Sequence, residues 1–182
     1  LMDSFPGFPT CIEILRWYME SDQNDMNRLT ILDCNNFWSP TGGGVRRYHL
    51  QKLKYFDGLE GIRHIFVMPD RYTATEQYGA HSFIEHLKAV KQPGAGEYRY
   101  IFNTRALRRF VDKYRPDVIE IGSPYFLPWL IRPVLSGLTS RPALVGFWHN
   151  DFPRTQVGRT LRSWPHPIRV SGEKAAWWWA RK

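Results

Sequence analysis

Three consecutive glycines, Gly42, Gly43 and Gly44, stand between an apolar run at 29–34 and a stretch at 45–56. The run has the composition of a buried strand, and the later stretch spaces its apolar residues so that a helix can gather them on one broad face. A strand, a glycine loop and a helix in this order offer free backbone N–H groups to an anion at the helix N-terminus. The pattern predicts a phosphate site; the alternative is that the glycines only allow positive φ in a turn.

Two common phosphate-binding motifs do not fit this loop. A dinucleotide fingerprint of G-x-G-x-x-G that starts at Gly42 needs glycine at position 47, where Arg47 stands. The segment between the apolar run and Gly42 is also longer than the tight turn of that motif. No G-x-x-x-x-G-K-S/T occurs in the sequence, which excludes a P-loop.

A second polar set, His149, Asn150 and Asp151, follows the apolar run at 143–148. Imidazole titrates near neutral pH and can hold a sugar hydroxyl or a phosphate oxygen, but a histidine at a strand end can also cap the strand or bond a nearby loop. Asp151 can fix the tautomer of His149 or cap a helix predicted at 153–162. We find no Ser–His–Asp order that suggests a triad and no carboxylate pair placed as acid and base.

The other metal-ligand residue types form no metal-binding pattern. His81, Glu85 and His86 fall in a stretch at 80–91 that we predict to be a short helix, where an exposed pair one turn apart explains them. Cys11 and Cys34 are too few for a disulfide framework, and Cys34 suits a small buried residue at a strand end. We therefore expect neither a metal nor a cofactor.

Predicted strands and helices alternate along the chain. The strands are 29–34, 62–68, 98–102, 117–121 and 143–148, the helices are 45–56, 80–91, 105–114, 125–135 and 168–182, and 71–78 is a loop. Thr104 has the position of an N-cap for the third helix, while Ser123 and Pro124 open the fourth. This alternation predicts an α/β fold, a Rossmann-like three-layer domain with a mainly parallel sheet.

Ligands of such sheets gather beyond the carboxyl ends of the strands. The glycine loop, the turn at 122–124 and the polar set at 149–151 each follow a predicted strand. We therefore expect these three segments to meet at one edge of the sheet.

Length and charge bear on domains and partners. The 182 residues, 43% of them hydrophobic, suit one folded domain, which we expect at 28–182 after a lead-in at 1–27.

The region 141–182 has eight basic and two acidic residues, which is +6 of the total +8. Basic residues beside Trp164 and the tryptophans at 177–179 suit an anionic membrane surface or nucleic-acid stacking, although we favour packing within the protein. The last helix has no C-cap, so we expect the chain to be truncated inside it.

Three motifs in order carry a resemblance: N-N-F-W-S-P-T-G-G-G-V-R-R-Y at 35–48, R-P-D-V-I-E-I-G-S-P at 115–124 and L-V-G-F-W-H-N-D at 144–151. Together they resemble the N-terminal, acceptor-side domain of family 4 glycosyltransferases, one half of the GT-B fold. The resemblance covers residues 28–182.

The resemblance implies transfer of a sugar from a nucleotide-sugar donor to a glycan, lipid or small-molecule acceptor, with retention at the anomeric carbon and without a metal. It implies that Gly42, Gly43, Gly44 and Arg47 approach the donor phosphates and that His149 lies near the reacting centre. The acceptor side would be lined by Ser123, Pro124, Asn150 and Asp151.

The sequence departs from the family because nothing corresponds to the second, C-terminal domain that normally grips the donor. We expect this chain alone to bind nucleotide sugar weakly and to transfer nothing. The alternatives are a half-site or binding module that needs a separate donor-domain chain, and an unrelated nucleotide-binding α/β protein. A nucleic-acid binder is the last choice, and the expected location is cytoplasmic, with peripheral membrane contact left open.

Overall fold

The structure is a computed structural model that describes residues 28–36, 38–91, 97–122, 127–147 and 165–180. Its main sheet has the strand order β3-β4-β2-β1-β7-β8, and β5 and β6 form a separate pair. The strands are β1 Leu29–Cys34, β2 Ile62–Asp70, β3 Ala74–Gln77, β4 Ser82–Lys88, β5 Val90–Lys91, β6 Arg99–Tyr100, β7 Val118–Ile121 and β8 Ala143–Gly146. The described helices are α2 Gly44–Asp57, α3 Thr104–Tyr114, α4 Leu127–Leu135 and α6 His166–Ala180.

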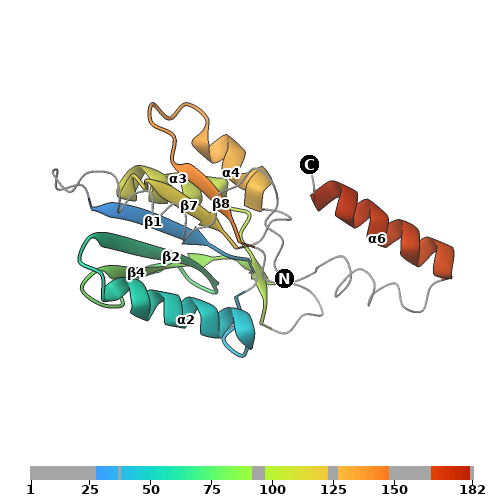
Figure 1. The fold of residues 1–182 in the computed structure, drawn as a ribbon, viewed down its shortest axis with the longest axis horizontal. Coiled ribbons are helices and arrows are strands. Elements are labelled where there is room, and N and C mark those ends of the chain that lie inside the picture. Colours follow the sequence, from blue (N-terminus) through green and yellow to red (C-terminus); the bar gives the residue numbers. More distant parts are fainter. Residues whose placement is uncertain (1–27, 37, 92–96, 123–126, 148–164, 181–182) are drawn as a thin grey trace.

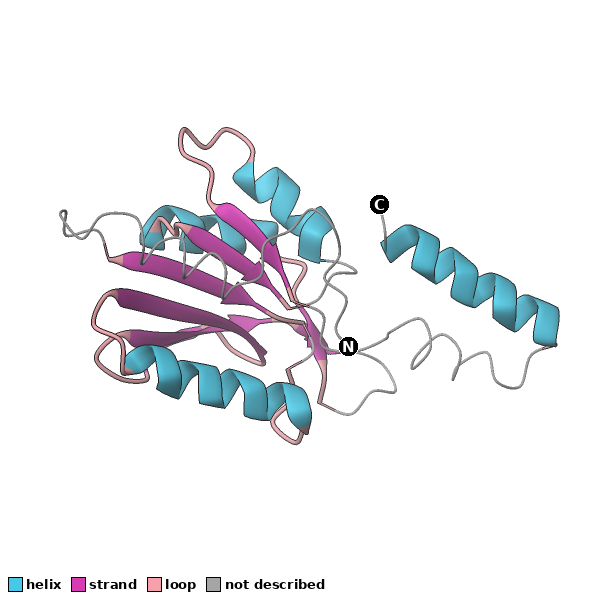
Figure 2. Ribbon diagram, viewed as in Figure 1, coloured by secondary structure: helices cyan, strands magenta, loops and turns pink. Residues whose placement is uncertain are grey.

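The main sheet is parallel except at one edge. β4, β2, β1, β7 and β8 pair in parallel, and only β3 runs antiparallel to its neighbour β4. Helix α2 covers one face of this sheet, and α3 and α4 cover the other (Figures 1 and 2). The predicted α/β fold with three layers and a mainly parallel sheet is therefore confirmed.

Apolar packing on both faces explains why the central strands carry almost continuous hydrophobic runs. All six residues of β1 are buried. On one face Leu107, Phe110 and Val111 of α3 pack against the sheet, as their helical spacing predicts. On the other face Leu53 and Phe56 of α2 are buried, whereas the predicted apolar residues near the start of that helix are half-buried.

The N-cap of α3 differs from the prediction. Asn103 occupies this position, and its side-chain oxygen accepts a hydrogen bond of 3.0 Å from the backbone N–H of Ala106. Thr104 is the first helical residue instead. Asparagine is at least as favourable as threonine at an N-cap, so the local chemistry permits the shift by one residue.

The predicted helix at 80–91 is wrong, because Ser82–Lys88 forms strand β4 between β2 and β3. The predicted loop at 71–78 contains strand β3 for the same reason. Glu85 and His86 are buried and bonded to partners distant in sequence, so the interpretation as an exposed helical pair is also wrong. Pairing of β4 with β2 and β3 outweighs the weak local preference of this segment for a helix.

The predicted strand at 98–102 is reduced to the two residues of β6, which pair with β5 rather than with the main sheet. Strands β1, β2, β7 and β8 lie where they were predicted, with ends that differ by one or two residues. Among the described helices none has the length and apolar character needed to cross a membrane.

Strand β1 marks the point where the order of the sheet reverses. The chain passes from β1 to β2 and β4 on one side, and then returns to β7 and β8 on the other side. The carboxyl ends of β1 and β7 lie next to each other, joined by a hydrogen bond of 2.8 Å from the N–H of Gly122 to the carbonyl of Cys34. In open parallel sheets this is where the ligand crevice lies.

Substitution of Gly122 tests how closely the carboxyl ends of β1 and β7 approach each other. A Cβ at this position would lie 2.6 Å from Nδ2 and 2.8 Å from Cγ of Asn35. We expect Gly122→Ala to lower the free energy of unfolding by about 1–3 kcal/mol, the usual cost of overpacking. Gly146→Ala at the end of β8, where a Cβ meets nothing within 4 Å, is the matched control. Urea denaturation measures both, and an equal effect of the two substitutions would contradict the packing described.

Candidate functional site

The glycine loop leads into α2 with an N-terminus that no side chain caps. Gly43 is the N-cap residue, with φ −82° and ψ −103°. It has no side chain that could accept a hydrogen bond from the helix, and the first turn of α2 contains no acidic residue. The N–H groups of this turn therefore point out of the helix without a side-chain acceptor, which favours an anion there.

Positive φ does not explain the three glycines. Positive φ occurs at Gly137 and at Arg115, but not at Gly42, Gly43 or Gly44. Only Gly42 is closely packed, because a Cβ there would lie 3.0 Å from the carbonyl oxygen of Ser39. Gly43 and Gly44 have open space within 4 Å, so their lack of side chains leaves the backbone accessible to a ligand.

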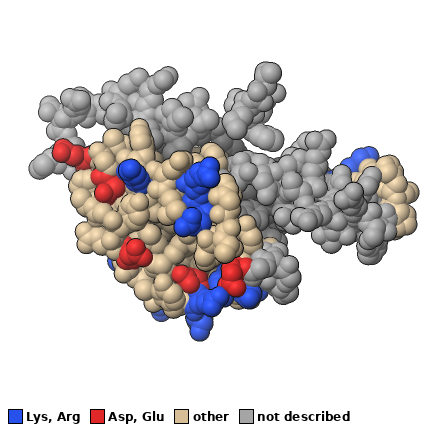
Figure 3. Space-filling model, turned by 90° about the horizontal axis from the view of Figure 1, so that it is seen from below, with Lys and Arg blue, Asp and Glu red and all other residues tan. Residues whose placement is uncertain are grey.

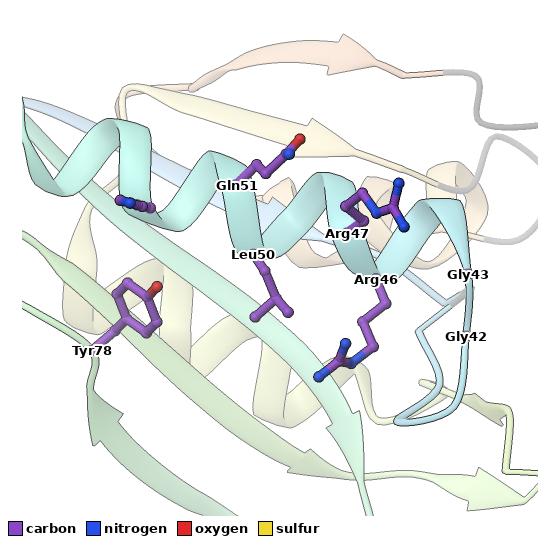
Figure 4. Close-up of a pocket in the computed structure, with 8 residues that line it drawn as sticks. Gly42, Gly43, Arg46, Arg47, Leu50, Gln51 and Tyr78 are labelled. Carbon is purple, nitrogen blue, oxygen red and sulfur yellow. The ribbon is translucent and has the colours of Figure 1, made fainter.

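A surface pocket of about 410 Å³ lies beside this helix start. Its lining comprises Gly42, Gly43, Arg46, Arg47, Leu50, Gln51, Lys54 and Tyr78. Figure 4 shows Arg46 and Leu50 on one side of α2, and Arg47 and Gln51 on the other. Arg46, Arg47 and Lys54 form no ion pair with a carboxylate in the described part of the chain. An anion at the helix N-terminus would therefore meet Arg46 and Arg47, whose charges are not already neutralised.

The predicted site residues are only in part described. Gly42, Gly43, Gly44 and Arg47 lie together at the helix start. Ser123, Pro124, His149, Asn150 and Asp151 lie outside the described residues, as does the helix predicted at 153–162. The strands that precede them, β7 and β8, run parallel to β1, so their carboxyl ends point to the same edge of the sheet.

A buried ionic cluster under α2 was not predicted. It comprises Asp33 of β1, His49 and Lys52 of α2, His64 of β2 and Glu120 of β7, each at most 8% exposed. Nζ of Lys52 lies 2.9 Å from Oδ2 of Asp33 and 2.6 Å from Oε1 of Glu120. Asp33 and Glu120 are directly opposite each other in the pairing of β1 with β7. The cluster therefore ties α2 to the two strands that meet at the crevice.

Histidines extend the cluster on either side of Asp33. Nδ1 of His49 lies 3.1 Å from Oδ2 of Asp33, and its Nε2 lies 2.6 Å from Nδ2 of Asn35, the first residue after β1. His49 stacks on Phe66, with ring centroids 4.4 Å apart. Nε2 of His64 lies 3.6 Å from Oδ2 of Asp33, which is too far for a good hydrogen bond.

Burial and charge act against each other on the pKa values of the cluster. Burial opposes ionisation of Asp33, but the charge of Lys52, followed by the interaction with His49, holds the pKa of this carboxyl well below its usual range. Burial also disfavours the charged form of Lys52, but the carboxylates of Asp33 and Glu120 raise its pKa above the usual range. Asp33 and Lys52 are therefore both charged at neutral pH.

His64 and Cys34 behave differently, because burial dominates both. Burial lowers the pKa of His64 to about 4, and the nearby Asp33 offsets this only in part. Burial, and then the charge of Asp33, raises the pKa of the Cys34 thiol, so that Cys34 is an unreactive buried residue as predicted.

One sequence signal could have revealed the cluster. Strands buried on both faces are normally apolar throughout, yet Asp33 and Glu120 interrupt the runs L-T-I-L-D-C and V-I-E-I. A buried carboxylate requires a cation or hydrogen-bond donors. Nothing in the local sequence shows which cation, because Lys52 is 19 positions from Asp33.

Two further observations concern metal ions and nucleic acid. Among the described residues, no group of three or more His, Cys, Asp or Glu side chains is arranged to hold a metal ion.

On the face viewed in Figure 3, the described Lys and Arg side chains lie among Asp and Glu side chains rather than in one basic patch. This part of the surface therefore lacks the basic stripe typical of nucleic-acid binding.

Comparison with known proteins gives the class of the fold. No protein-family profile and no curated protein sequence matches the chain. Among solved structures it is similar to sucrose-phosphate synthase from Thermosynechococcus elongatus, with a TM-score of 0.50 and 16% identity over 82% of this chain and 40% of that chain. The present chain thus spans about 40% of the length of that GT-B glycosyltransferase. It has a glycosyltransferase-like, GT-B-like half-domain fold.

The low pKa of His64 predicts a dependence of stability on pH. Below pH about 6.5 the unfolded chain binds a proton at His64, whereas the folded chain binds it only below about 4. The free energy of unfolding should therefore rise with pH between these values, by about 3 kcal/mol at most from this group. We expect His64→Leu to remove this contribution, measured by urea denaturation from pH 4.5 to 7.5. The same pH slope in both proteins would contradict the assignment.

Proposed function

We propose that this chain is the N-terminal, acceptor-side domain of a retaining family 4 glycosyltransferase. The enzyme would transfer a sugar from a nucleotide-sugar donor to a glycan, lipid or small-molecule acceptor. The observation that carries the proposal is the uncapped N-terminus of α2, which follows a glycine loop at the carboxyl end of β1 in a GT-B-like fold.

The chemistry of this helix start suits a leaving nucleoside diphosphate. When the bond from the anomeric carbon to the donor phosphate breaks, negative charge develops on the phosphate oxygens. Backbone N–H groups and the positive end of the α2 dipole stabilise that charge, and they need no reorganisation during the reaction. Arg47, on the first turn of α2, adds a positive charge beside the pocket. The proposal requires no metal ion and no cofactor.

The remaining roles rest on the resemblance and on position in the chain. His149 would contact the sugar near the reacting centre, and Ser123, Pro124, Asn150 and Asp151 would line the acceptor side. These residues follow β7 and β8, whose carboxyl ends share an edge with that of β1. A second, donor-binding domain would complete the cleft, and the enzyme would act in the cytoplasm, either free or in peripheral contact with a membrane.

A binding module that works with a separate donor-domain chain is the second candidate. Both candidates share the phosphate site, and they differ in whether the two halves belong to one polypeptide.

Nucleotide binding by the 182-residue chain tests the proposal. Calorimetric titration with UDP, GDP and ADP should show weak binding of at least one, and no sugar transfer from the corresponding nucleotide sugars. Arg47→Ala should weaken the binding about fivefold, which corresponds to about 1 kcal/mol. Arg105→Ala, an exposed arginine in the first turn of α3, is the matched control and should change nothing.

Three results would count against this account. Absence of binding by the unmodified chain would remove the phosphate site. An equal effect of Arg47→Ala and Arg105→Ala would place the binding elsewhere. Sugar transfer by the chain alone would contradict the need for a second domain.

A further inference from the structure

We propose that Lys52 is a positioning residue for the glycine loop. It holds α2 in a fixed place over the crevice and balances the buried carboxylates beneath it. This inference rests on the proposed function, because it concerns how the same anion site is kept in its working geometry.

The ion pairs of Lys52 fix α2 against two strands at once. Its ammonium group contacts Asp33 of β1 at 2.9 Å and Glu120 of β7 at 2.6 Å. These are the strands between which the order of the sheet reverses, and the two carboxylates are opposite each other in the pairing. Lys52 lies about 12 Å along the helix axis from Gly44, at 1.5 Å per residue. A tilt or shift of α2 at Lys52 would therefore displace the N–H groups of its first turn.

Hydrogen bonds also connect these ion pairs to the start of the glycine loop. His49 lies one turn earlier on the same buried face of α2, and it bridges Asp33 and Asn35. Asn35 is the residue with which the chain leaves β1 on its way to the glycines. Tyr48 adds a second link, because its hydroxyl donates a hydrogen bond of 3.3 Å to Oε1 of Glu120. The helix and the start of the loop are thus held by one network.

Charge gives a second reason for a lysine at this position. Two buried carboxylates near the carboxyl ends of β1 and β7 would repel an anionic ligand in the crevice above them. Oδ1 of Asp33 and Oε2 of Glu120 have no hydrogen-bond partner among the described residues, and Lys52 is the cation that contacts both carboxylates. Lys52, 8% exposed, lies among them and does not line the pocket. Its charge acts through the carboxylates rather than by direct contact with the ligand.

Stability alone does not explain this arrangement. Buried ion pairs contribute little to stability, and well-packed apolar residues of similar volume often replace them without loss. A buried ionic network instead restricts the helix to the one geometry that satisfies its charges. That restriction is what a preorganised anion site requires.

The test separates ligand affinity from folding. The double variant Lys52→Met/Glu120→Gln removes one positive and one negative charge together, so that the net charge of the cluster is unchanged and Asp33 keeps His49 as a partner. The probe is inorganic pyrophosphate, titrated calorimetrically into the 182-residue chain, with the folded fraction measured by near-ultraviolet circular dichroism. Per folded molecule, the affinity of the double variant should fall about tenfold, the lower end of the loss seen when residues that support a ligand site are replaced. Lys88→Met, an exposed lysine at the end of β4, should bind as the unmodified chain does.

The outcomes distinguish the inference from the proposed function. If the unmodified chain binds pyrophosphate and the folded double variant binds it equally well, Lys52 is only structural and the inference is overturned while the phosphate site stands. If the unmodified chain does not bind, both fall together. Should the double variant fail to fold, Glu120→Gln alone replaces the carboxylate that holds Lys52 to β7 with a neutral amide. The affinity for pyrophosphate should then fall by less than expected for the double variant, and an unchanged affinity overturns the inference.

Discussion

The contact of Lys52 with Asp33 and Glu120 is the constraint on which the arrangement of the crevice depends. It joins the only described helix on its face of the sheet to the two strands whose carboxyl ends form the crevice (Figure 1). Apolar packing of Leu53 and Phe56 supplies the attraction between helix and sheet but tolerates small shifts. Paired charges do not tolerate such shifts, because a carboxylate that loses its cation inside the protein is costly.

The ion pairs of Lys52 hold the helix whose first turn is the proposed phosphate site. Gly43 and Gly44 leave the backbone open, and no side chain caps the helix that they begin. The fold is similar to a GT-B half-domain, and this helix start lies at the carboxyl edge of its parallel sheet, where open parallel sheets bind ligands. The proposed sugar transfer combines these two observations with the resemblance of the loop motifs. In that proposal a second domain would supply the rest of the donor site.

The sequence predicted those features that depend on local pattern. The strand at 29–34, the helix after the glycines and the buried face of α3 follow from apolar spacing, and all three are present. Strand β4 was missed because its buried polar residues are stabilised from a distance: His86 by Asp70 and Glu76, and Glu85 by Lys113 and Tyr114. The buried ionic cluster was missed for the same reason, since Asp33 and Glu120 become neighbours only when β1 pairs with β7.

We propose that the first turn of α2 binds the phosphates of the donor. Backbone amide chemical shifts of the isotopically labelled chain, recorded while inorganic pyrophosphate is added, test it most directly. We expect the largest changes at the amides of Gly43, Gly44 and Val45, where the N–H groups would face the ligand. Changes confined to other segments, with these three amides unaffected, would contradict it.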